Sequence, residues 1–433
     1  MTEFFNRSIL DKLKKWIFRR EIFAIKGPRQ SGKTTILKIL QKYLIEEEKI
    51  DSNNIIFLTL EDRDILYKLS ENPKEFVQSF ILHKPNERFF FFIDEFQYLR
   101  DGGQKLKLLY DIFENIKFII TGSSSLELTS ETAKFLVGRV FSFFLYQLNF
   151  EEFIGVQSTQ LSNVYQERAK LVRDFINEGK DFIVPDRDIF GADFERHFEK
   201  YLLFGGYPEV IKTDDIETKK LILKNIFDTY VNRDIIDLLR IMDIGKFRKI
   251  LELLANQIGN LINYNSLTND SQSYFSQLKH YLSILEQTFI IEQIRPFYSN
   301  KTTELKKNPK IYFIDTGFRN YLLNNFNDLS LRPDKGEIVE NSVFIQLRTK
   351  GIESIKYWRT LSKAEVDFII DSGERLIPIE VKYSYFKNPT VSRGFRNFLL
   401  QYQPAIAAIL TKNFWGSIKI DKTVVKFIPV WYL

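Results

Sequence analysis

The chain has 433 residues, 44% of them hydrophobic, and this length predicts two to four globular domains. It contains no cysteine, which excludes disulfides and thiolate metal sites. Its net charge is +6, and residues 331–433 alone hold 16 Lys and Arg against 10 Asp and Glu, so the basic excess lies in the last quarter. This distribution favours a polyanionic partner there, although basic surfaces are often only solvated.

The N-terminal stretch MTEFFNRSILDKLKKW carries charges throughout and has no signal-peptide core. No apolar run approaches the roughly 18 residues that a bilayer-spanning helix needs. We therefore expect a cytoplasmic protein that does not enter the membrane.

Residues 25–35 read IKGPRQSGKTT and match the pattern G-x-x-x-x-G-K-[ST]. An apolar run precedes the motif and an apolar-periodic stretch follows it, which predicts a strand, a loop and a helix. Backbone N–H groups of the loop would face phosphate oxygens, Lys33 would neutralise the β- and γ-phosphates, and the Thr34 hydroxyl would ligate Mg²⁺. The predicted nucleotide-binding residues are Gly27, Pro28, Arg29, Gln30, Ser31, Gly32, Lys33, Thr34 and Thr35.

A second apolar run, residues 89–93, leads directly into Asp94 and Glu95. Continuous hydrophobicity is typical of a central parallel strand that is covered on both faces. Two carboxylates at its carboxyl end would stand beside the phosphate-binding loop. We predict that Asp94 belongs to the Mg²⁺ shell and that Glu95 polarises the attacking water.

A third apolar run, IKFIITGSSS at residues 116–125, ends in Thr121 and the serines that begin at Ser123. These hydroxyls could sense the γ-phosphate or hold the catalytic water, although Gly-Ser clusters are also ordinary loops. The alternation of strands and helices predicts a doubly wound parallel P-loop core. Its strands are expected near residues 22–26, 55–60, 89–94, 117–121 and 140–146.

A glutamate directly after the strand aspartate, together with an intervening strand, resembles the AAA-like branch of P-loop ATPases. The guanine-reading N-K-x-D motif of GTPases is absent, so ATP is the expected nucleotide. The stretches FLVGRVFSFFLYQLNFEEF, LLFGGYPEV and TYVNRDIIDLL are similar to prokaryotic AAA-family ATPases whose C-terminal domain of unknown function has a restriction-endonuclease-like appearance.

This resemblance implies that Arg139 is a γ-phosphate sensor or an arginine finger, acting in its own chain or across a subunit boundary of a homo-oligomer. It also implies that Pro208, in a Gly-x-Pro element, contacts the nucleotide from a helical lid. A surface arginine and a plain helix-ending turn are the alternatives.

Residues 241–330 suggest a helix, a short helix, a longer helix and then a β wing, which is the order of a winged helix. The exposed positions around the long helix supply few basic groups, so DNA contact and a structural or partner-binding role both stay open. These positions are Gln272, Gln277, Lys279 and His280.

The last quarter combines a predicted helix carrying Glu337 and Glu340 with strands carrying Asp367 and then Glu380-Val381-Lys382. Glu380 and Lys382 would share one face of their strand. This arrangement resembles the PD-(D/E)xK nucleases. The resemblance implies that Asp367 and Glu380 bind Mg²⁺, with Glu340 or Glu337 completing the shell, and that Lys382 positions or deprotonates a water. A structural ion-pair cluster is the alternative.

We therefore expect an α/β protein with a P-loop AAA-like ATPase core (1–150), a helical lid (151–240), a winged helix (241–330) and a restriction-endonuclease-like domain (331–433). Its expected ligands are ATP and Mg²⁺, with DNA as a candidate partner of the last two parts. The expected function is ATP hydrolysis coupled to a nuclease-like domain. The alternative is an ATP-dependent switch or scaffold whose inactive C-terminal domain binds a protein or DNA.

Overall fold

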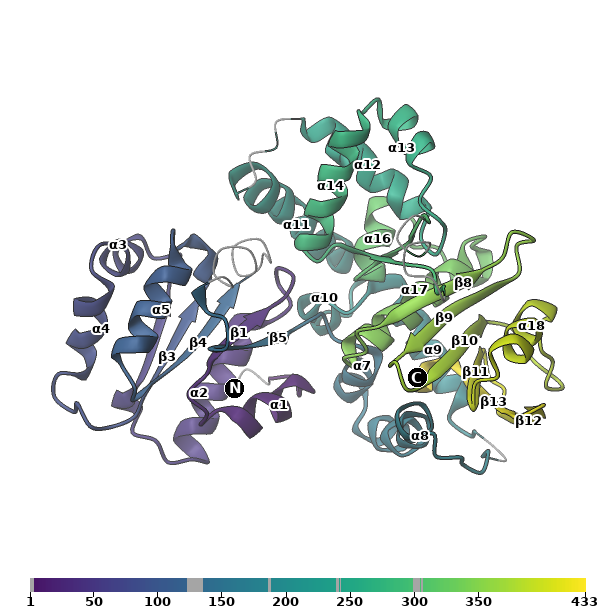
Figure 1. Cartoon of the computed structure of the whole chain (residues 1–433), viewed down its shortest axis with the longest axis horizontal. Helices are drawn as coiled ribbons and strands as arrows, with labels where there is room; N and C mark the ends of the chain where they lie inside the picture. Colours follow the sequence, from purple (N-terminus) through teal and green to yellow (C-terminus); the bar gives the residue numbers. More distant parts are fainter. Residues whose placement is uncertain are drawn as a thin grey trace. The chain divides into compact units, whose positions relative to one another are not determined.

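The computed structural model describes residues 4–122, 135–185, 188–238, 241, 243–298, 304 and 307–433. The chain divides into two compact units, and their parts can be followed by colour in Figure 1. Unit 1 comprises Met1–Gln147, Asn232–Leu238 and Gln287–Phe289, and unit 2 comprises Leu148–Val231, Leu239–Glu286 and Ile290–Leu433. Within the described ranges, no helix is both long and apolar enough to cross a membrane.

Unit 1 is built on a five-stranded sheet of order β2-β3-β4-β1-β5 in which every neighbouring pair is parallel. The strands lie where the apolar runs predicted them, which confirms a parallel α/β core. Their bounds are β1 (Ile22–Lys26), β2 (Ile55–Thr59), β3 (Phe89–Asp94), β4 (Ile116–Gly122) and β5 (Val140–Phe144).

Helices cover both faces of this sheet, which explains the unbroken hydrophobicity of β3. Phe89, Phe91 and Ile93 pack into one core, and Phe90 and Phe92 pack into another on the opposite face. Helices α3 (Arg63–Glu71), α4 (Pro73–Ile81) and α5 (Gly102–Ile112) contribute to the first core, and α1 (Ile9–Trp16) and α2 (Lys33–Glu46) contribute to the second. Short 3₁₀ turns, η1 (Ser52–Asn54) and η2 (Phe96–Tyr98), precede β2 and follow β3.

The first part of unit 2 is helical and includes a small β-hairpin. Three helices, α12, α13 and α14, precede the two antiparallel strands β6 and β7, in the order that the sequence predicted for residues 241–330. The elements are α7 (Phe150–Gln157), α8 (Thr159–Glu178), α9 (Gly191–Phe204), α10 (Pro208–Lys212), α11 (Ile216–Thr229), α12 (Ile244–Asn256), α13 (Tyr264–Ser271), α14 (Phe275–Gln287), β6 (Ile291–Ile294), β7 (Lys310–Phe313) and α16 (Thr316–Leu322). The π-helix η4 (Tyr230–Leu238) follows α11, and its residues from Asn232 onward belong to unit 1.

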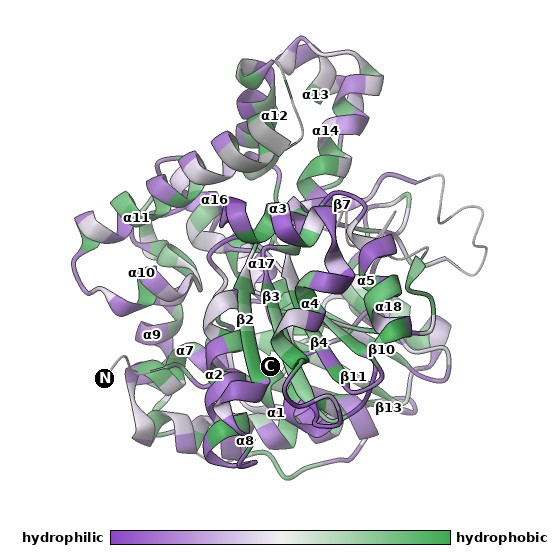
Figure 2. Cartoon of the chain, turned by 90° about the vertical axis from the view of Figure 1, so that its left-hand side faces the viewer, coloured by the Kyte–Doolittle hydropathy of each residue, from purple (hydrophilic) through white to green (hydrophobic). Residues whose placement is uncertain are grey.

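The last part of unit 2 is a six-stranded sheet of order β12-β13-β11-β10-β9-β8. Its strands β8, β9 and β10 are antiparallel, β10, β11 and β13 are parallel, and the edge strand β12 is antiparallel. Strands of both units are coloured mainly as hydrophobic in Figure 2, while the helices alternate. The bounds are η5 (Leu329–Leu331), α17 (Lys335–Thr349), β8 (Ile355–Arg359), β9 (Glu365–Asp371), β10 (Leu376–Lys382), α18 (Arg393–Tyr402), β11 (Ile406–Thr411), β12 (Gly416–Ile420), β13 (Thr423–Pro429) and η6 (Val430–Tyr432).

Helices of the expected lid pack directly on this C-terminal sheet. The Tyr432 hydroxyl donates to Asp188 Oδ2 at 2.9 Å, and the Lys412 ammonium pairs with Glu195 at 2.7 Å. The Tyr165 ring on α8 lies 5.7 Å from the Tyr432 ring. Residues 148–231 and 331–433 therefore belong to one compact body.

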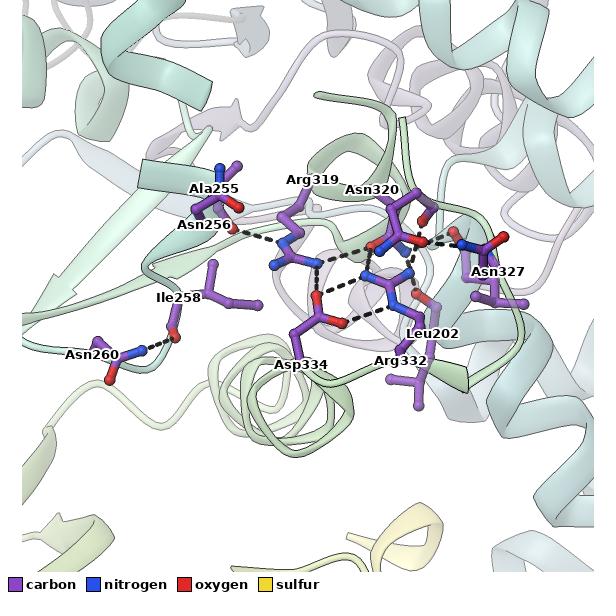
Figure 3. A network of polar contacts seen from close by, with 12 residues as sticks. Leu202, Ala255, Asn256, Ile258, Asn260, Arg319, Asn320, Asn327, Arg332 and Asp334 are labelled. Atoms are coloured by element: carbon purple, nitrogen blue, oxygen red, sulfur yellow. Dashed lines mark hydrogen bonds and ion pairs between the residues drawn. The ribbon is translucent and has the colours of Figure 1, made fainter. Parts of the chain in front are cut away.

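A buried polar network joins four helices of unit 2, α9, α12, α16 and α17 (Figure 3). Arg319 and Arg332, which are 2% and 4% exposed, both bind the Asp334 carboxylate, and Arg332 does so through two nitrogens at 2.8 and 2.9 Å. Arg319 also donates to the Ala255 carbonyl at 2.8 Å, and Asn320 donates to the Leu202 carbonyl at 2.9 Å.

Asp334 is the shared anion of this network. Burial alone would raise the pKa of its carboxyl, but hydrogen bonds from Arg332 and Arg319 outweigh burial and lower the pKa to about 2. Because two nearly buried guanidiniums share this one carboxylate, removing its charge leaves both of them poorly compensated.

We expect the substitution Asp334→Asn to lower the free energy of unfolding by about 3 kcal/mol at pH 7, the lower end for breaking a buried ion pair, because Asp334 is partly exposed. The carboxyl's pKa is lowered in the folded state, so its stabilisation is complete above about pH 4 and is lost as the pH falls toward 2. Urea titrations at pH 7, 4 and 2.5 should show that the difference in free energy of unfolding between the wild type and Asp334→Asn becomes smaller as the pH falls. The control Asp328→Asn, at an exposed position, should change stability by less than about 0.5 kcal/mol.

Candidate functional site

The loop between β1 and α2 needs glycine at two positions for two different reasons. A Cβ on Gly27 would lie 2.0 Å from the backbone oxygen of Leu145, so the loop passes too close to the end of β5 for any side chain. Gly32 has φ 96°, in the left-handed region that glycine adopts without strain, and α2 begins at the next residue. The loop therefore bends back tightly over the edge of the sheet.

Lys33 is buried and lies over the backbone of this loop. Its ammonium donates to the carbonyl oxygens of Gly27 at 3.0 Å and Pro28 at 2.7 Å. The Ser31 hydroxyl donates to the same Pro28 oxygen at 2.9 Å. The lysine charge is thereby held where a P-loop receives the phosphate chain of its nucleotide.

Thr34 and Asp94 meet at the carboxyl edge of the sheet, as the sequence predicted. The Thr34 hydroxyl donates to Asp94 Oδ2 at 2.6 Å. The other carboxylate oxygen, Oδ1, accepts from the Thr121 hydroxyl and from the Glu95 backbone N–H. Two hydroxyl side chains, 60 and 27 positions away in sequence, thus meet at one carboxylate.

Glu95 is held by its backbone and by its side chain. Its φ of 56° is unusual for a non-glycine residue, and its backbone N–H donates to the Thr121 hydroxyl at 3.2 Å. Its carboxylate accepts a hydrogen bond from Gln97 Nε2. Sequence reasoning did not find Gln97, because an isolated glutamine in an irregular stretch carries no pattern.

Arg7 is a further site residue that the sequence analysis missed. Its guanidinium donates to the Ser31 carbonyl at 3.0 Å and to the Tyr146 carbonyl at 2.6 Å, so it ties the phosphate-binding loop to the segment after β5. A single arginine ahead of the first helix gives no sequence signal for this contact.

Arg139 lies at the amino-terminal end of the parallel strands, whereas the phosphate-binding loop lies at their carboxyl end. It directly precedes β5, whose first residue pairs with Ile22 at the start of β1, whereas the loop follows the end of β1. A five-residue strand separates the two edges by about 16 Å, and Arg139 Nε binds Asp111 at 3.1 Å. Arg139 therefore does not reach the nucleotide site of its own chain. Ser123 lies outside the described residues.

Pro208 begins α10 in unit 2, and the turn before it is fixed by Asp315. The Asp315 carboxylate accepts from the backbone N–H groups of Gly206 and Phe318, both at 2.7 Å. A Cβ on Gly205 would lie 2.2 Å from this carboxylate. Burial raises the pKa of Asp315 to about 6, and the backbone hydrogen bonds partly oppose the shift. The Gly-Gly-Tyr-Pro turn thus has a structural partner that the sequence did not reveal.

Of the expected DNA-facing residues around α14, Gln277, Lys279 and His280 contact side chains of α13 or α14; the His280 ring lies 6.2 Å from the Tyr281 ring. The Lys279 ammonium lies 4.1 Å from the centroid of the Tyr264 ring, and Gln277 Nε2 donates to the Tyr281 hydroxyl at 3.0 Å. Gln272 and His280 are exposed.

In the C-terminal sheet, three of the expected residues come together. The backbone N–H of Val381 donates to Asp367 Oδ2 at 2.7 Å, and the Lys382 ammonium lies 3.2 Å from Glu380 Oε1, which also accepts from the Ser392 hydroxyl. Burial, reinforced by the charge of Glu340, raises the pKa of Asp367 to about 7. Glu380 is 3% exposed, and its Oε2 has no hydrogen-bond partner among the described residues.

Glu340 contacts two side chains of β7. Its Oε1 accepts from the Lys310 ammonium at 2.9 Å and from the Tyr312 hydroxyl at 2.6 Å. Across the described part of the chain, no group of three or more His, Cys, Asp or Glu side chains is arranged to hold a metal ion. The expected magnesium site of Glu340, Asp367 and Glu380 stays a prediction, and β7 places Lys310 against Glu340, a contact that no sequence pattern linked to these acids. The alternative ligand, Glu337, likewise stays a prediction.

Residues 19–154 match the family model described as an AAA domain, and residues 195–329 and 335–433 match domains of unknown function, DUF8612 and DUF4143. An uncharacterized protein from Haemophilus influenzae is 26% identical over 419 residues, which cover 95% of this chain and 94% of the relative. The uncharacterized protein MJ1544 from Methanocaldococcus jannaschii is 28% identical over 390 residues, which cover 87% of this chain and 77% of the relative.

Among solved structures, the Aeropyrum pernix ORC1 protein in complex with DNA aligns over 75% of this chain and 94% of its own, with a TM-score of 0.31 and 9% identity. A likeness this weak supports no statement about function. Taken together, the AAA match and the parallel sheet with its phosphate-binding loop make residues 19–154 an AAA-type P-loop domain.

We expect Gly27→Ala to destabilise the protein by about 1–3 kcal/mol, because the added methyl forces the loop away from the Leu145 carbonyl. Gly155→Ala, at an exposed helical position where the nearest atom would lie at 3.7 Å, should raise stability by up to about 1 kcal/mol. Chemical denaturation of both variants measures the contrast. Equal stability of Gly27→Ala and the wild type would contradict the tight approach of loop and strand.

Proposed function

We propose that this protein is an ATP-binding and ATP-hydrolysing AAA-type switch. The contact that carries the proposal is the 2.6 Å hydrogen bond between the Thr34 hydroxyl and the Asp94 carboxylate at the mouth of the phosphate-binding loop. P-loop ATPases use this pair of oxygens together to hold the Mg²⁺ of the nucleotide.

The residues present fit a magnesium ion at this position. Mg²⁺ takes oxygen ligands and binds through one or two protein groups, while phosphates and waters supply the others. Thr34 and Asp94 would hold it, and it would neutralise charge on the β- and γ-phosphates. Lys33 adds a second positive charge from the loop, and the backbone N–H groups at the start of α2 face the same phosphates.

Glu95 is the group that we assign to the attacking water. Its carboxylate stands one residue beyond Asp94, and Gln97 donates a hydrogen bond to it, so its position is set by the turn after β3. A carboxylate in this place orients the water and accepts its proton as the bond to the γ-phosphate breaks.

Arg139 suits an arginine finger only across a subunit boundary, since it stands at the far edge of its own sheet. A homo-oligomer in which one subunit presents Arg139 to the nucleotide of the next is therefore part of the proposal. Its pairing with Asp111 at 3.1 Å would then be exchanged for a phosphate contact.

We assign residues 241–330 to a winged helix and residues 331–433 to a restriction-endonuclease-like domain. The support is the order of three helices followed by a hairpin in the first, and of α17, three antiparallel strands, α18 and a parallel strand in the second. The basic excess of the last 103 residues favours a nucleic acid as the partner. Since the lid helices pack on this sheet, a nucleotide-driven movement would carry unit 2 as one body.

Between a cleaving and a non-cleaving C-terminal domain, the geometry favours the second. Asp367, Glu380 and Lys382 converge, but Glu340 is engaged by Lys310 and Tyr312. A switch that binds a DNA or protein partner through an inactive domain therefore fits the contacts better than a metal nuclease.

We expect Glu95→Gln to keep ATP affinity and to lower the rate of hydrolysis by about 10²–10⁴-fold, because it removes the proton acceptor and leaves the phosphate contacts in place. Thr34→Val should abolish the effect of magnesium on ATP affinity, whereas the control Thr34→Ser, which retains the hydroxyl, should keep it. Phosphate release and binding of a fluorescent ATP analogue measure the two properties. Full hydrolysis by Glu95→Gln would remove that residue from the mechanism.

We expect no Mg²⁺- or Mn²⁺-dependent cleavage of single- or double-stranded DNA or RNA above that of the Asp367→Asn variant, with or without ATP. The reason is that, among the described residues, no group of three or more acidic side chains is arranged to hold a metal ion. Gel analysis of labelled substrates tests this. Cleavage by the wild type that is lost in both Asp367→Asn and Lys382→Met, and kept in Lys33→Ala, would establish the nuclease instead.

A further inference from the structure

We infer that Lys310 is the resident cation of the C-terminal carboxylate cluster and that its ammonium group excludes a divalent metal ion from that cluster. The cluster comprises Glu340 on α17, Glu365 and Asp367 on β9, and Glu380 on β10. Lys310 comes from β7, in the region that matches a different family model from the four acids. This inference deepens the proposed function, because a non-cleaving domain follows from it.

Lys310 is bound on two sides by acids of the cluster. Its side chain is 1% exposed, and its ammonium lies 2.9 Å from Glu340 Oε1 and forms a second ion pair with Glu365. A lysine this deeply buried is stable as a cation only where carboxylates compensate it. These two ion pairs compensate the charge of the buried ammonium.

Contacts from other parts of the fold hold the Glu340 carboxylate in place. The Tyr312 hydroxyl donates to the same oxygen that binds Lys310, at 2.6 Å, and the Tyr312 ring is fully buried. Gly259, which follows α12, comes so near that a Cβ there would lie 3.4 Å from Glu340 Oε1. Its N–H donates to the Ile311 carbonyl of β7 at 2.9 Å. Freeing Glu340 Oε1 for a metal ion would break its contacts with both Lys310 and Tyr312.

The charges of the site nearly balance without a metal ion. Four carboxylates, Glu340, Glu365, Asp367 and Glu380, face three cations, Lys310, Arg359 and Lys382. Asp367, whose pKa is about 7, carries only part of a negative charge at neutral pH, so the two signs nearly cancel. A divalent ion would add two further positive charges to a group that is already nearly balanced, which costs desolvation energy without a matching gain in attraction. Removing the Lys310 charge leaves the group with a larger net negative charge.

The consequence is that the ion pairs of Lys310 with Glu340 and Glu365 join the β6–β7 hairpin to the C-terminal part of unit 2. They lie at the carboxylate cluster in which a nuclease would hold its metal ion. Lys310 connects the helical part of unit 2 to the carboxylates, so the cluster acts as a structural junction between the two matched regions.

Manganese binding to the full, nucleotide-free chain tests the inference, with electron paramagnetic resonance reporting free Mn²⁺. We expect the wild type to bind Mn²⁺ no better than Asp367→Asn does. We expect Lys310→Met to bind it at least about tenfold more tightly than the wild type, which is the low end of effects on metal affinity from residues around a ligand set. The gain should disappear in the double variant Lys310→Met/Asp367→Asn. Bound Mn²⁺ should also raise the melting temperature of Lys310→Met but not that of the wild type.

The matched control is Lys356→Met. Lys356 on β8 of the same sheet is also mostly buried and pairs with two acids, Glu304 at 3.0 Å and Asp371 at 3.3 Å. Loss of the Lys356 charge should lower the free energy of unfolding of the protein without creating affinity for Mn²⁺.

Two results would overturn the inference. One is a folded Lys310→Met whose Mn²⁺ affinity equals that of the wild type. The other, which needs no Lys310 variant to fold, is nucleotide-free wild type that binds Mn²⁺ and loses about tenfold or more of that affinity in Asp367→Asn or Glu380→Gln. Neither result depends on ATP hydrolysis or on cleavage, so a failure here is distinguishable from a failure of the proposed switch.

Discussion

The Asp94 carboxylate at the carboxyl end of β3 is the point on which the N-terminal unit depends. One oxygen accepts from the Thr34 hydroxyl at the start of α2, and the other accepts from Thr121 on β4 and from the backbone of Glu95. Each contact joins a different element of the sheet edge, so the parallel order β3-β4-β1 is a requirement of the site. The same carboxylate fixes the turn that presents Glu95. Fold and proposed chemistry therefore depend on one buried anion.

Unit 2 has a comparable organisation, with charged groups at its internal junctions. Asp334 joins two arginines where four helices meet, Asp315 fixes the turn before α10, and Lys310 joins the β6–β7 hairpin to the C-terminal sheet. Buried ion pairs contribute little net stability, but removing one partner is costly. These charged groups therefore tie together parts of unit 2 that lie far apart in the sequence.

The sequence was sufficient to predict the parallel core and the meeting of Thr34 with Asp94, because a glycine-rich loop and an acid after an apolar strand are local patterns with one geometric outcome. It was sufficient for the convergence of Asp367, Glu380 and Lys382, because a strand places alternate residues on one face. It could not predict Arg7, Asp315 or Lys310. Each of these contacts at least one residue that lies 24 or more positions away, and a single charged residue has no periodicity that identifies such a partner.

Lys310 shows why a set of acids is weak support for a metal site. The helix glutamate and the strand acids fit a nuclease pattern when only residue types and spacing are considered, and the structure does bring most of them together. The fold then supplies a cation from a separate hairpin, 30 residues before Glu340. An ammonium group and a hydrated magnesium ion compete for the same carboxylate oxygens, and the ammonium is tethered, so its local concentration is always high. Whether such a cluster binds metal depends on the cations that the rest of the fold delivers to it.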